Sequence, residues 1–234
     1  MKYLFSAGLL SSLLLILAAS PGCTSDTSAP KITVPDTSLQ QEPSNQQDPG
    51  ISDDYTHTDR VIWQKPNMVI ELLGDLSDKT IADIGAGTGF FSLRLTPKAK
   101  KVIAIDIDQR FVSYLDSIKH LQLPEAMQGK LETRLATPTD PSLAPEEADI
   151  AIIVNTIVYM NNRIAYLKTL KKGIRPGGQL LIIDFKKKRT PVGPPQELKV
   201  PAFQIEEELY QAGYKEVLVN DTALDYQYIV LART

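Results

Sequence analysis

The sequence predicts an α/β protein in which a parallel β-sheet is covered by helices on both faces. Short apolar runs with strand character alternate with helical patterns from Asp59 to the end of the chain, which is typical of this class. A glycine-rich turn, Gly85–Gly89, joins the first such run to the helical segment that follows. The run Asp149–Val154 is apolar from Ile150 onward, as expected of a strand buried on both faces.

The elements follow one another at regular intervals after Asp59. A helical segment is expected first, over residues 61–73, with an interruption at Pro66. Strands are expected at residues 79–84, 101–106, 131–135, 149–154, 179–185, 215–219 and 226–232. Further helices are expected at residues 90–95, 109–121, 163–172 and 205–212. Asp108 is a suitable N-cap for the second of these, and ligands of such sheets bind beyond the carboxyl ends of the strands.

Composition excludes several kinds of protein. Hydrophobic residues make up 43% of the 234-residue chain, so a packed core is expected. The formal net charge of −3 argues against a protein that coats nucleic acid. Cys23 is the single cysteine, which rules out an intramolecular disulfide. With only His57 and His120 besides, no metal site is expected.

The first 22 residues resemble a signal peptide. A basic start is followed by an apolar run, residues 3–19, and small residues lead to Cys23. The arrangement is similar to a bacterial lipoprotein signal, which implies that Cys23 is the lipidated first residue. Thr24 follows the cysteine, which in that group favours the outer membrane of a Gram-negative cell. An uncleaved membrane anchor is the alternative, and both readings place the rest of the chain outside the cytoplasm, facing the periplasm in such a cell.

Residues 23–58 differ in composition from the rest of the chain. After Cys23 they are rich in Ser, Thr, Gln, Asp and Pro, and residues 24–58 carry a net charge of −5. Such a segment buries too little apolar surface to offset the entropy of ordering it. We therefore expect a disordered acidic tether up to residue 58 and one domain over residues 59–234, which carries a net charge of only +1.

Two features indicate the chemistry of this domain. The loop Gly85-Ala86-Gly87-Thr88-Gly89 follows a strand and allows close approach of a ligand to the backbone. Phe90 stands where the dinucleotide fingerprint requires glycine, and no Lys-Ser or Lys-Thr pair follows the loop as in a phosphate-binding P-loop. Asp106 ends the next strand, where a carboxylate can accept hydrogen bonds from a free ribose. A nucleoside without a pyrophosphate, bound close to the backbone, describes S-adenosylmethionine.

With these motifs, residues 59–234 resemble the class I S-adenosylmethionine-dependent methyltransferases. The matching pieces are Ala82–Phe90, Val102–Ile107, the strand ending at Asn155, and Arg175–Asp184. The resemblance implies a Rossmann-like fold, with a doubly wound, mostly parallel sheet of seven strands and an antiparallel last strand. It implies cofactor contacts from Asp83, Gly85, Ala86, Gly87, Gly89, Asp106 and Ile107. In that arrangement Asp83 lies beneath the amino end of the donor, Asp106 holds the ribose and Ile107 packs on the adenine.

The acceptor side of the site is less well defined by the sequence. Asn155 and Tyr159 follow the fourth strand, where acceptors bind in this family, and are weak substrate candidates. Asn155 is not followed by the Pro-Pro-aromatic triplet of methyltransferases that act on amide or base nitrogens. Trp63–Pro66 and Val192–Pro195 resemble pieces of a bacterial group of small-molecule methyltransferases. We therefore expect a small-molecule acceptor and no nucleic acid, although no catalytic base can be assigned.

Two further hypotheses compete with methyl transfer. The chain could bind a nucleoside outside the cytoplasm without turnover, or it could use the fold as an interaction scaffold, because a fold does not prove a reaction. The intact glycine loop and Asp106 favour retained binding. The basic run Lys186–Arg189 follows the fifth strand, where it either attracts an anionic acceptor or forms a solvated loop.

Overall fold

The computed structural model describes residues 59–234, so the expectations for the signal peptide, Cys23 and the acidic tether lie outside the described residues. The helices are α1 (Arg60–Gln64), α2 (Pro66–Glu71), α3 (Ser92–Leu95), α4 (Gln109–Gln122), α5 (Glu125–Gln128), α6 (Arg163–Gly173) and α7 (Ala202–Gln211). Two 3-10 helices, η2 (Ile157–Tyr159) and η3 (Gln196–Leu198), lie in loops. In this part of the chain, no helix is both long and apolar enough to cross a membrane.

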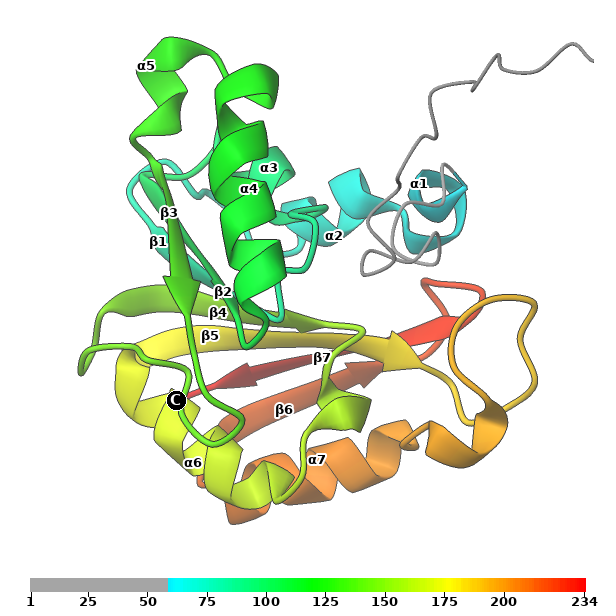
Figure 1. Ribbon diagram of the computed structural model, residues 1–234. Coiled ribbons are helices and arrows are strands. Elements are labelled where there is room, and N and C mark those ends of the chain that lie inside the picture. The colour runs from blue at the N-terminus through cyan, green and yellow to red at the C-terminus, as the bar shows by residue number, and fades with distance from the viewer. Residues whose placement is uncertain (1–58) are drawn as a thin grey trace, which may run out of the picture. The chain divides into compact units, whose positions relative to one another are not determined.

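A seven-stranded sheet forms the centre of the domain, as the sequence predicts (Figure 1). Its strands are β1 (Thr80–Ile84), β2 (Lys101–Asp106), β3 (Leu131–Leu135), β4 (Ala148–Val154), β5 (Ile174–Phe185), β6 (Lys215–Asn220) and β7 (Gln227–Arg233). The strand order is β3-β2-β1-β4-β5-β7-β6. The pairs from β3 to β5 are parallel, whereas β7 is antiparallel to both β5 and β6. The expected antiparallel last strand is therefore confirmed.

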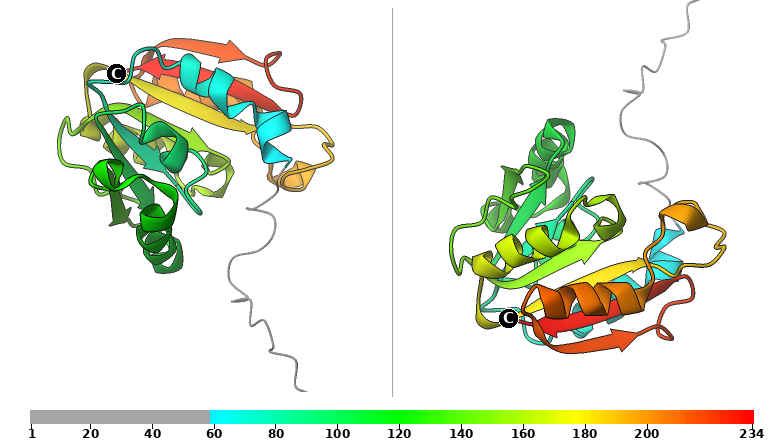
Figure 2. Two further views of the ribbon diagram at one scale, coloured as in Figure 1. Left: turned by 90° about the horizontal axis from the view of Figure 1, so that it is seen from above. Right: turned by 90° about the horizontal axis from the view of Figure 1, so that it is seen from below.

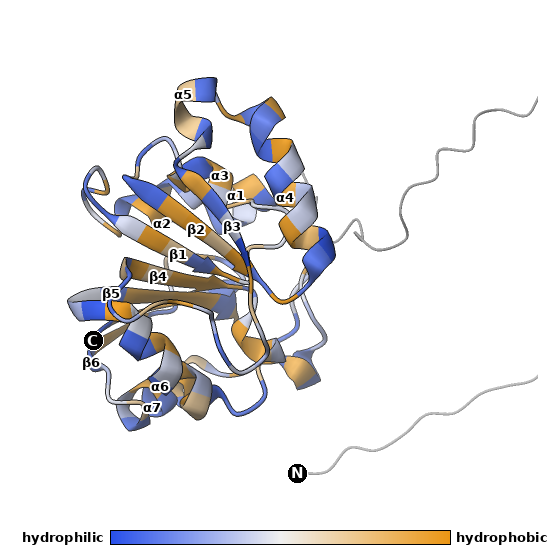
Figure 3. Ribbon diagram, turned by 60° about the vertical axis from the view of Figure 1, so that its left-hand side comes forward, coloured by the Kyte–Doolittle hydropathy of each residue, from blue (hydrophilic) through white to orange (hydrophobic). Residues whose placement is uncertain are grey.

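Helices cover both faces of the sheet. The pair α6 and α7 packs on one face, where Leu167 and Leu209 join a buried cluster with the sheet (Figure 2). On the other face, Ile70 of α2, Leu95 of α3 and Leu115 of α4 are buried. All seven residues of β4 are buried, which confirms the expectation from its apolar run, and the central strands are accordingly coloured as hydrophobic in Figure 3.

Three expected elements begin elsewhere in the structure, one of them α7, which begins at Ala202 and not at residue 205. The helix expected from Phe90 begins only at Ser92, because the Arg94 amide donates to the Phe91 carbonyl oxygen at 3.0 Å and not to that of Phe90, as in the tighter 3-10 turns that often precede a helix. The fifth strand begins at Ile174 rather than at residue 179. The interruption at Pro66 is confirmed, since Lys65 has a φ of +48° and separates α1 from α2. Asp108 caps α4 as expected by accepting a hydrogen bond from the Arg110 amide.

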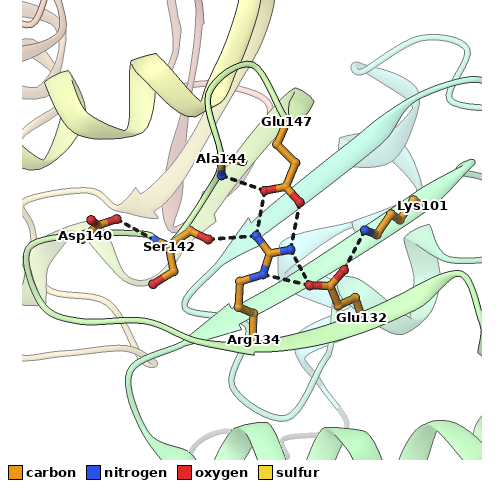
Figure 4. A network of polar contacts seen from close by, with 7 residues as sticks. All are labelled: Lys101, Glu132, Arg134, Asp140, Ser142, Ala144 and Glu147. Atoms are coloured by element: carbon orange, nitrogen blue, oxygen red, sulfur yellow. Dashed lines mark hydrogen bonds and ion pairs between the residues drawn. The ribbon is translucent and has the colours of Figure 1, made fainter.

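An ion-pair network fastens the edge strand β3 to the loop before β4 (Figure 4). The Arg134 guanidinium contacts Glu132 on its own strand, both carboxylate oxygens of Glu147 at 2.8 Å, and the Ser142 carbonyl oxygen at 2.8 Å. Hydrogen bonding from Arg134 lowers the pKa of Glu147 to about 2. The network therefore stabilises the domain chiefly where Glu147 is ionised.

Replacing Arg134 by glutamine is expected to lower the free energy of unfolding by about 1–2 kcal/mol at pH 7. A carboxyl whose pKa is lowered by folding contributes stability above its unfolded pKa, and loses it as the pH falls through the folded pKa. The difference from wild type should therefore shrink as the pH falls from about 4.5 toward 2, as measured by urea unfolding at pH 7 and 3. Arg110→Gln, which breaks the exposed pair with Asp108, should change the stability by under about 1 kcal/mol. An Arg134→Gln difference that stays constant with pH would contradict this role.

Candidate functional site

A cavity of about 810 Å³ lies at the carboxyl ends of the central strands. The chain runs outward from β1 to β3 and then returns to place β4 beside β1, so the cavity is at the switch point of the sheet, where ligands of such folds bind. Its walls include residues 84–88, 105–108, 136–138, 154–156, 184–185 and 191–195. Five segments that are distant in the sequence thus meet the loop after β1 at one site.

Glycines allow the loop after β1 to pack closely on one neighbour and leave space on the cavity side. The amides of Gly85 and Ala86 donate to the Ile105 carbonyl oxygen at 2.8 and 3.0 Å. A Cβ on Gly85 would lie 2.4 Å from Thr156 Oγ1, so this glycine is required by close packing. Gly87 has a φ of +55° and lines the cavity, and a Cβ there would meet nothing within 4 Å. The space beside Gly87 is therefore left for a ligand.

Asp106 lies at the end of β2 with its carboxylate fixed. Oδ2 accepts from the Gly87 amide at 2.8 Å, and Oδ1 accepts from the Asp108 amide at 3.0 Å. Each carboxylate oxygen has a second acceptor position, so two hydroxyl groups can still be bound. The neighbouring Ile107 is 60% exposed and lines the same cavity, as does Ala136 after β3. A carboxylate that can accept hydrogen bonds from a diol, that of Asp106, therefore lies beside the apolar surface of Ile107.

Asp83 lies beneath the loop and outside the cavity wall. It is 3% exposed, and Ser92 Oγ donates to its Oδ2 at 2.6 Å. Burial raises the pKa of Asp83 to about 6, against the opposing effect of the Ser92 hydrogen bond and of Arg60. Gly89 also lies outside the wall, where its hydrogen atom faces Leu115. These two residues support the loop, whereas Gly85, Ala86 and Gly87 line the cavity itself.

The acceptor candidates Asn155 and Tyr159 both line the cavity. Asn155 has a φ of +59° and its side-chain oxygen accepts a hydrogen bond from Gln227. Tyr159, in η2, is 60% exposed. In the basic run, Lys186 Nζ donates to the Leu224 carbonyl oxygen at 2.8 Å, so this lysine anchors the loop to the segment before β7. Residues 187–189 of the run are exposed.

Three cavity residues were not singled out as site residues by the sequence. Arg60 is placed over the Phe90 ring at 4.1 Å, and burial lowers its pKa to about 10. Trp63 packs on Phe185 with ring centroids 5.6 Å apart, and its Nε1 is buried without a hydrogen-bond partner in the described chain. Asp184 Oδ2 is buried and unpaired in the same way, and burial raises the pKa of Asp184 to about 7. Trp63 and Asp184 lie in pieces of sequence that resemble methyltransferases, but the environment of all three residues is set by contacts between distant segments.

The wall residues fit S-adenosylmethionine. The space beside Gly87 admits a ligand to the backbone, Asp106 offers acceptors for a ribose, and Ile107 offers an apolar surface for a base. Arg60 is a cation in the same wall, suited to a carboxylate. Fold and site together resemble those of the class I S-adenosylmethionine-dependent methyltransferases, and the residues of the wall fit S-adenosylmethionine as the cofactor.

Comparison with known proteins supports this class. The methyltransferase domain family matches residues 82–182. A structure of an S-adenosylmethionine-dependent methyltransferase from Aquifex aeolicus superposes with a TM-score of 0.70 and 25% identity, covering 77% of this chain and 95% of that one. Residues 82–182 thus match a methyltransferase domain, and the described fold is similar to that of a solved S-adenosylmethionine-dependent methyltransferase.

Two curated relatives act on RNA according to their names. The tRNA U34 carboxymethyltransferase of Cellvibrio japonicus is 31% identical over 122 residues, which is 50% of this chain and 36% of that protein. The ribosomal RNA small subunit methyltransferase A of Koribacter versatilis is 30% identical over 99 residues, 39% of this chain and 35% of that protein. This chain therefore spans about a third of the length of these relatives.

Replacing Asp106 by alanine is expected to weaken binding of S-adenosylhomocysteine by about 1–3 kcal/mol, the scale for losing hydrogen bonds to a charged group. The change also leaves the Gly87 and Asp108 amides without their acceptor. Isothermal calorimetry on wild type and variant measures the difference. Asp116→Ala, which removes the same charge from the outer surface of α4, serves as the control and should bind like wild type. Equal affinities for Asp106→Ala and wild type would remove Asp106 from the site.

Proposed function

We propose that the protein transfers the methyl group of S-adenosylmethionine to a small-molecule acceptor that enters the same cavity. The observation that carries this proposal is the composition of the cavity wall. Asp106 and Gly87 line the cavity together with Asn155, Trp63 and Phe185. Cofactor and acceptor would therefore share one cavity of about 810 Å³, within the range of small-molecule sites.

The residues of the wall align the reactants and exclude water. Bound S-adenosylmethionine supplies an electrophilic methyl group on its sulfonium. The loop at Gly85–Gly87 and the carboxylate of Asp106 hold the donor, whereas Trp63, Phe185 and the segment 191–195 cover the acceptor side. Alignment of this kind supplies much of the rate of a bimolecular transfer. The nearly balanced charge of residues 59–234, net +1, supports a small-molecule acceptor, because a polynucleotide site usually needs a broad basic face.

The location of the reaction is part of the proposal. The apolar run before Cys23 supports export and lipidation, so that a lipoprotein anchor would hold the domain at the membrane, with residues 24–58 as the tether. Cys23→Ser should abolish incorporation of a labelled fatty acid. Unchanged labelling in this variant would reject Cys23 as the anchor.

A methyl-transfer assay separates the candidate functions. Purified protein is incubated with methyl-labelled S-adenosylmethionine and either a small-molecule extract or total RNA, with Gly87→Val as the matched inactive control. Label in the small-molecule fraction alone is the expected result. Label in RNA, the substrate type of the two named relatives, would overturn the small-molecule assignment. Binding of S-adenosylhomocysteine with transfer to neither fraction would favour the non-catalytic nucleoside-binding protein.

A further inference from the structure

Four polar side chains form a continuous hydrogen-bonded relay that ends in the cavity. Arg60 Nε donates to Gln64 Oε1 at 2.5 Å, and Gln64 Nε2 donates to Gln227 Oε1 at 3.0 Å. Gln227 Nε2 in turn donates to Asn155 Oδ1. Both glutamines are fully buried at 0% exposure, and the relay joins α1, the start of β7 and the end of β4. Buried side-chain amides need hydrogen-bond partners, and the relay supplies them to both glutamines.

The first member of the relay sets the direction of every later bond. A guanidinium N–H can only donate, and Arg60 stays protonated at neutral pH, because its pKa is about 10. Gln64 must therefore turn its oxygen toward Arg60 and its NH2 toward Gln227. Because Gln227 Oε1 accepts from Gln64, the NH2 group of Gln227 is left to donate to Asn155 Oδ1. The Asn155 NH2 group is left over, and within residues 59–234 it donates no hydrogen bond to the protein.

We propose that this relay fixes Asn155 as a hydrogen-bond donor in the cavity, so that the site selects acceptor molecules that present an oxygen lone pair there. Gln64 and Gln227 are positioning residues, and Asn155 contacts the ligand. The proposal rests on the proposed function in taking the ligand to be the methyl acceptor. The orientation of the Asn155 side-chain amide does not depend on methyl transfer. Trp63 Nε1–H lies buried in the same wall without a hydrogen-bond partner among residues 59–234, and is a second donor that suits the same chemistry.

A single substitution reverses the relay. In Gln64→Glu, the carboxylate accepts from Arg60 and can only accept from Gln227, which must turn its NH2 toward residue 64. Gln227 Oε1 then faces Asn155, which turns its NH2 inward and its oxygen toward the cavity. Asn155→Asp reaches the same result at the half-buried end of the relay, because an aspartate accepts from Gln227 and presents only acceptors. This second variant leaves both buried glutamines in place, so it keeps the test valid if Gln64→Glu fails to fold.

The experiment compares two neutral probes of equal size, acetophenone, which only accepts hydrogen bonds, and indole, which only donates one. Binding to nitrogen-15-labelled full-length protein is followed by nuclear magnetic resonance through the indole N–H of Trp63, the single tryptophan of the chain and part of the cavity wall. Wild type is expected to prefer acetophenone. Both variants are expected to shift the ratio of the two dissociation constants toward indole by about tenfold, the scale of one hydrogen bond.

Gln122→Glu, at the exposed end of α4, adds the same charge outside the relay and should keep the wild-type ratio. Exchange of the Asn155 side-chain amide protons with solvent gives a readout without any ligand. The Asn155 NH2 protons should exchange freely in wild type and become protected in Gln64→Glu. An unchanged probe ratio in Asn155→Asp, or Asn155 protons protected in wild type, would overturn the proposal. Because neither measurement involves methyl transfer, a protein that binds the probes as expected but transfers no methyl would reject only the proposed function.

Discussion

Replacing Gly87 by valine is expected to abolish binding of S-adenosylhomocysteine, with a loss of more than about hundredfold, or about 2.7 kcal/mol. The new side chain would extend into space that is empty of protein atoms within 4 Å, and this space adjoins Asp106, whose Oδ2 accepts from the Gly87 amide at 2.8 Å. The branched side chain would thus occupy the volume that a ligand needs. Calorimetry measures the affinity, and urea unfolding measures the accompanying loss of stability.

Gly74→Val is the matched control for this variant. Gly74 has a φ of +78°, and a Cβ there also meets nothing within 4 Å, but the residue lies between α2 and β1, outside the cavity wall. Both variants carry the strain of a β-branched residue at positive φ, so both should lose stability. Only Gly87→Val should lose binding. Equal loss of binding in the two variants would show that strain, and not occupation of the cavity, explains the effect.

Replacing Asp184 by asparagine is expected to flatten the dependence of stability on pH. Burial raises the pKa of Asp184 from 3.8 to about 7, so folding favours the protonated form. For an acid with a raised pKa, stability is highest below the unfolded pKa and falls as the pH rises toward the folded pKa. The wild type should therefore lose up to about 4 kcal/mol of unfolding free energy between pH 4 and 8 through this group.

Urea unfolding at pH 4, 6 and 8 tests the Asp184 prediction. Asp184→Asn should remove the part of the fall that Asp184 carries, because asparagine does not titrate in that range, and should leave the part below about pH 6 that Asp83 carries. Asp149→Asn is the control, since Asp149 is also a buried carboxyl, but the Thr80 amide and Arg175 contact its two oxygens. This control should lower stability and retain the fall with pH. A wild-type curve without the fall would show that Asp184 does not carry a raised pKa.

The sheet was predictable because its signals are local. Alternating apolar runs and helical patterns identified all seven strands, and Asp108 and Pro66 marked a helix start and an interruption through their own backbone preferences. The late start of α3 was missed, although its cause is local as well. The Arg94 amide donates to the Phe91 carbonyl oxygen rather than to that of Phe90, and the sequence does not reveal such a three-residue hydrogen bond at a helix start.

By itself, the sequence determined the α/β class, the seven strands and the pairing of the glycine loop with Asp106. This pairing could be recognised because the strand-loop-helix pattern and the residue that ends the next strand lie within about 25 residues of chain. Tertiary structure decided the other half of the site. The contact of Gln64 with Gln227 joins residues 163 positions apart, and Trp63 meets Phe185 only because α1 packs beside the end of β5. Burial is likewise a property of the assembled core, so only the fold shows that Asp184 lacks water and has a raised pKa.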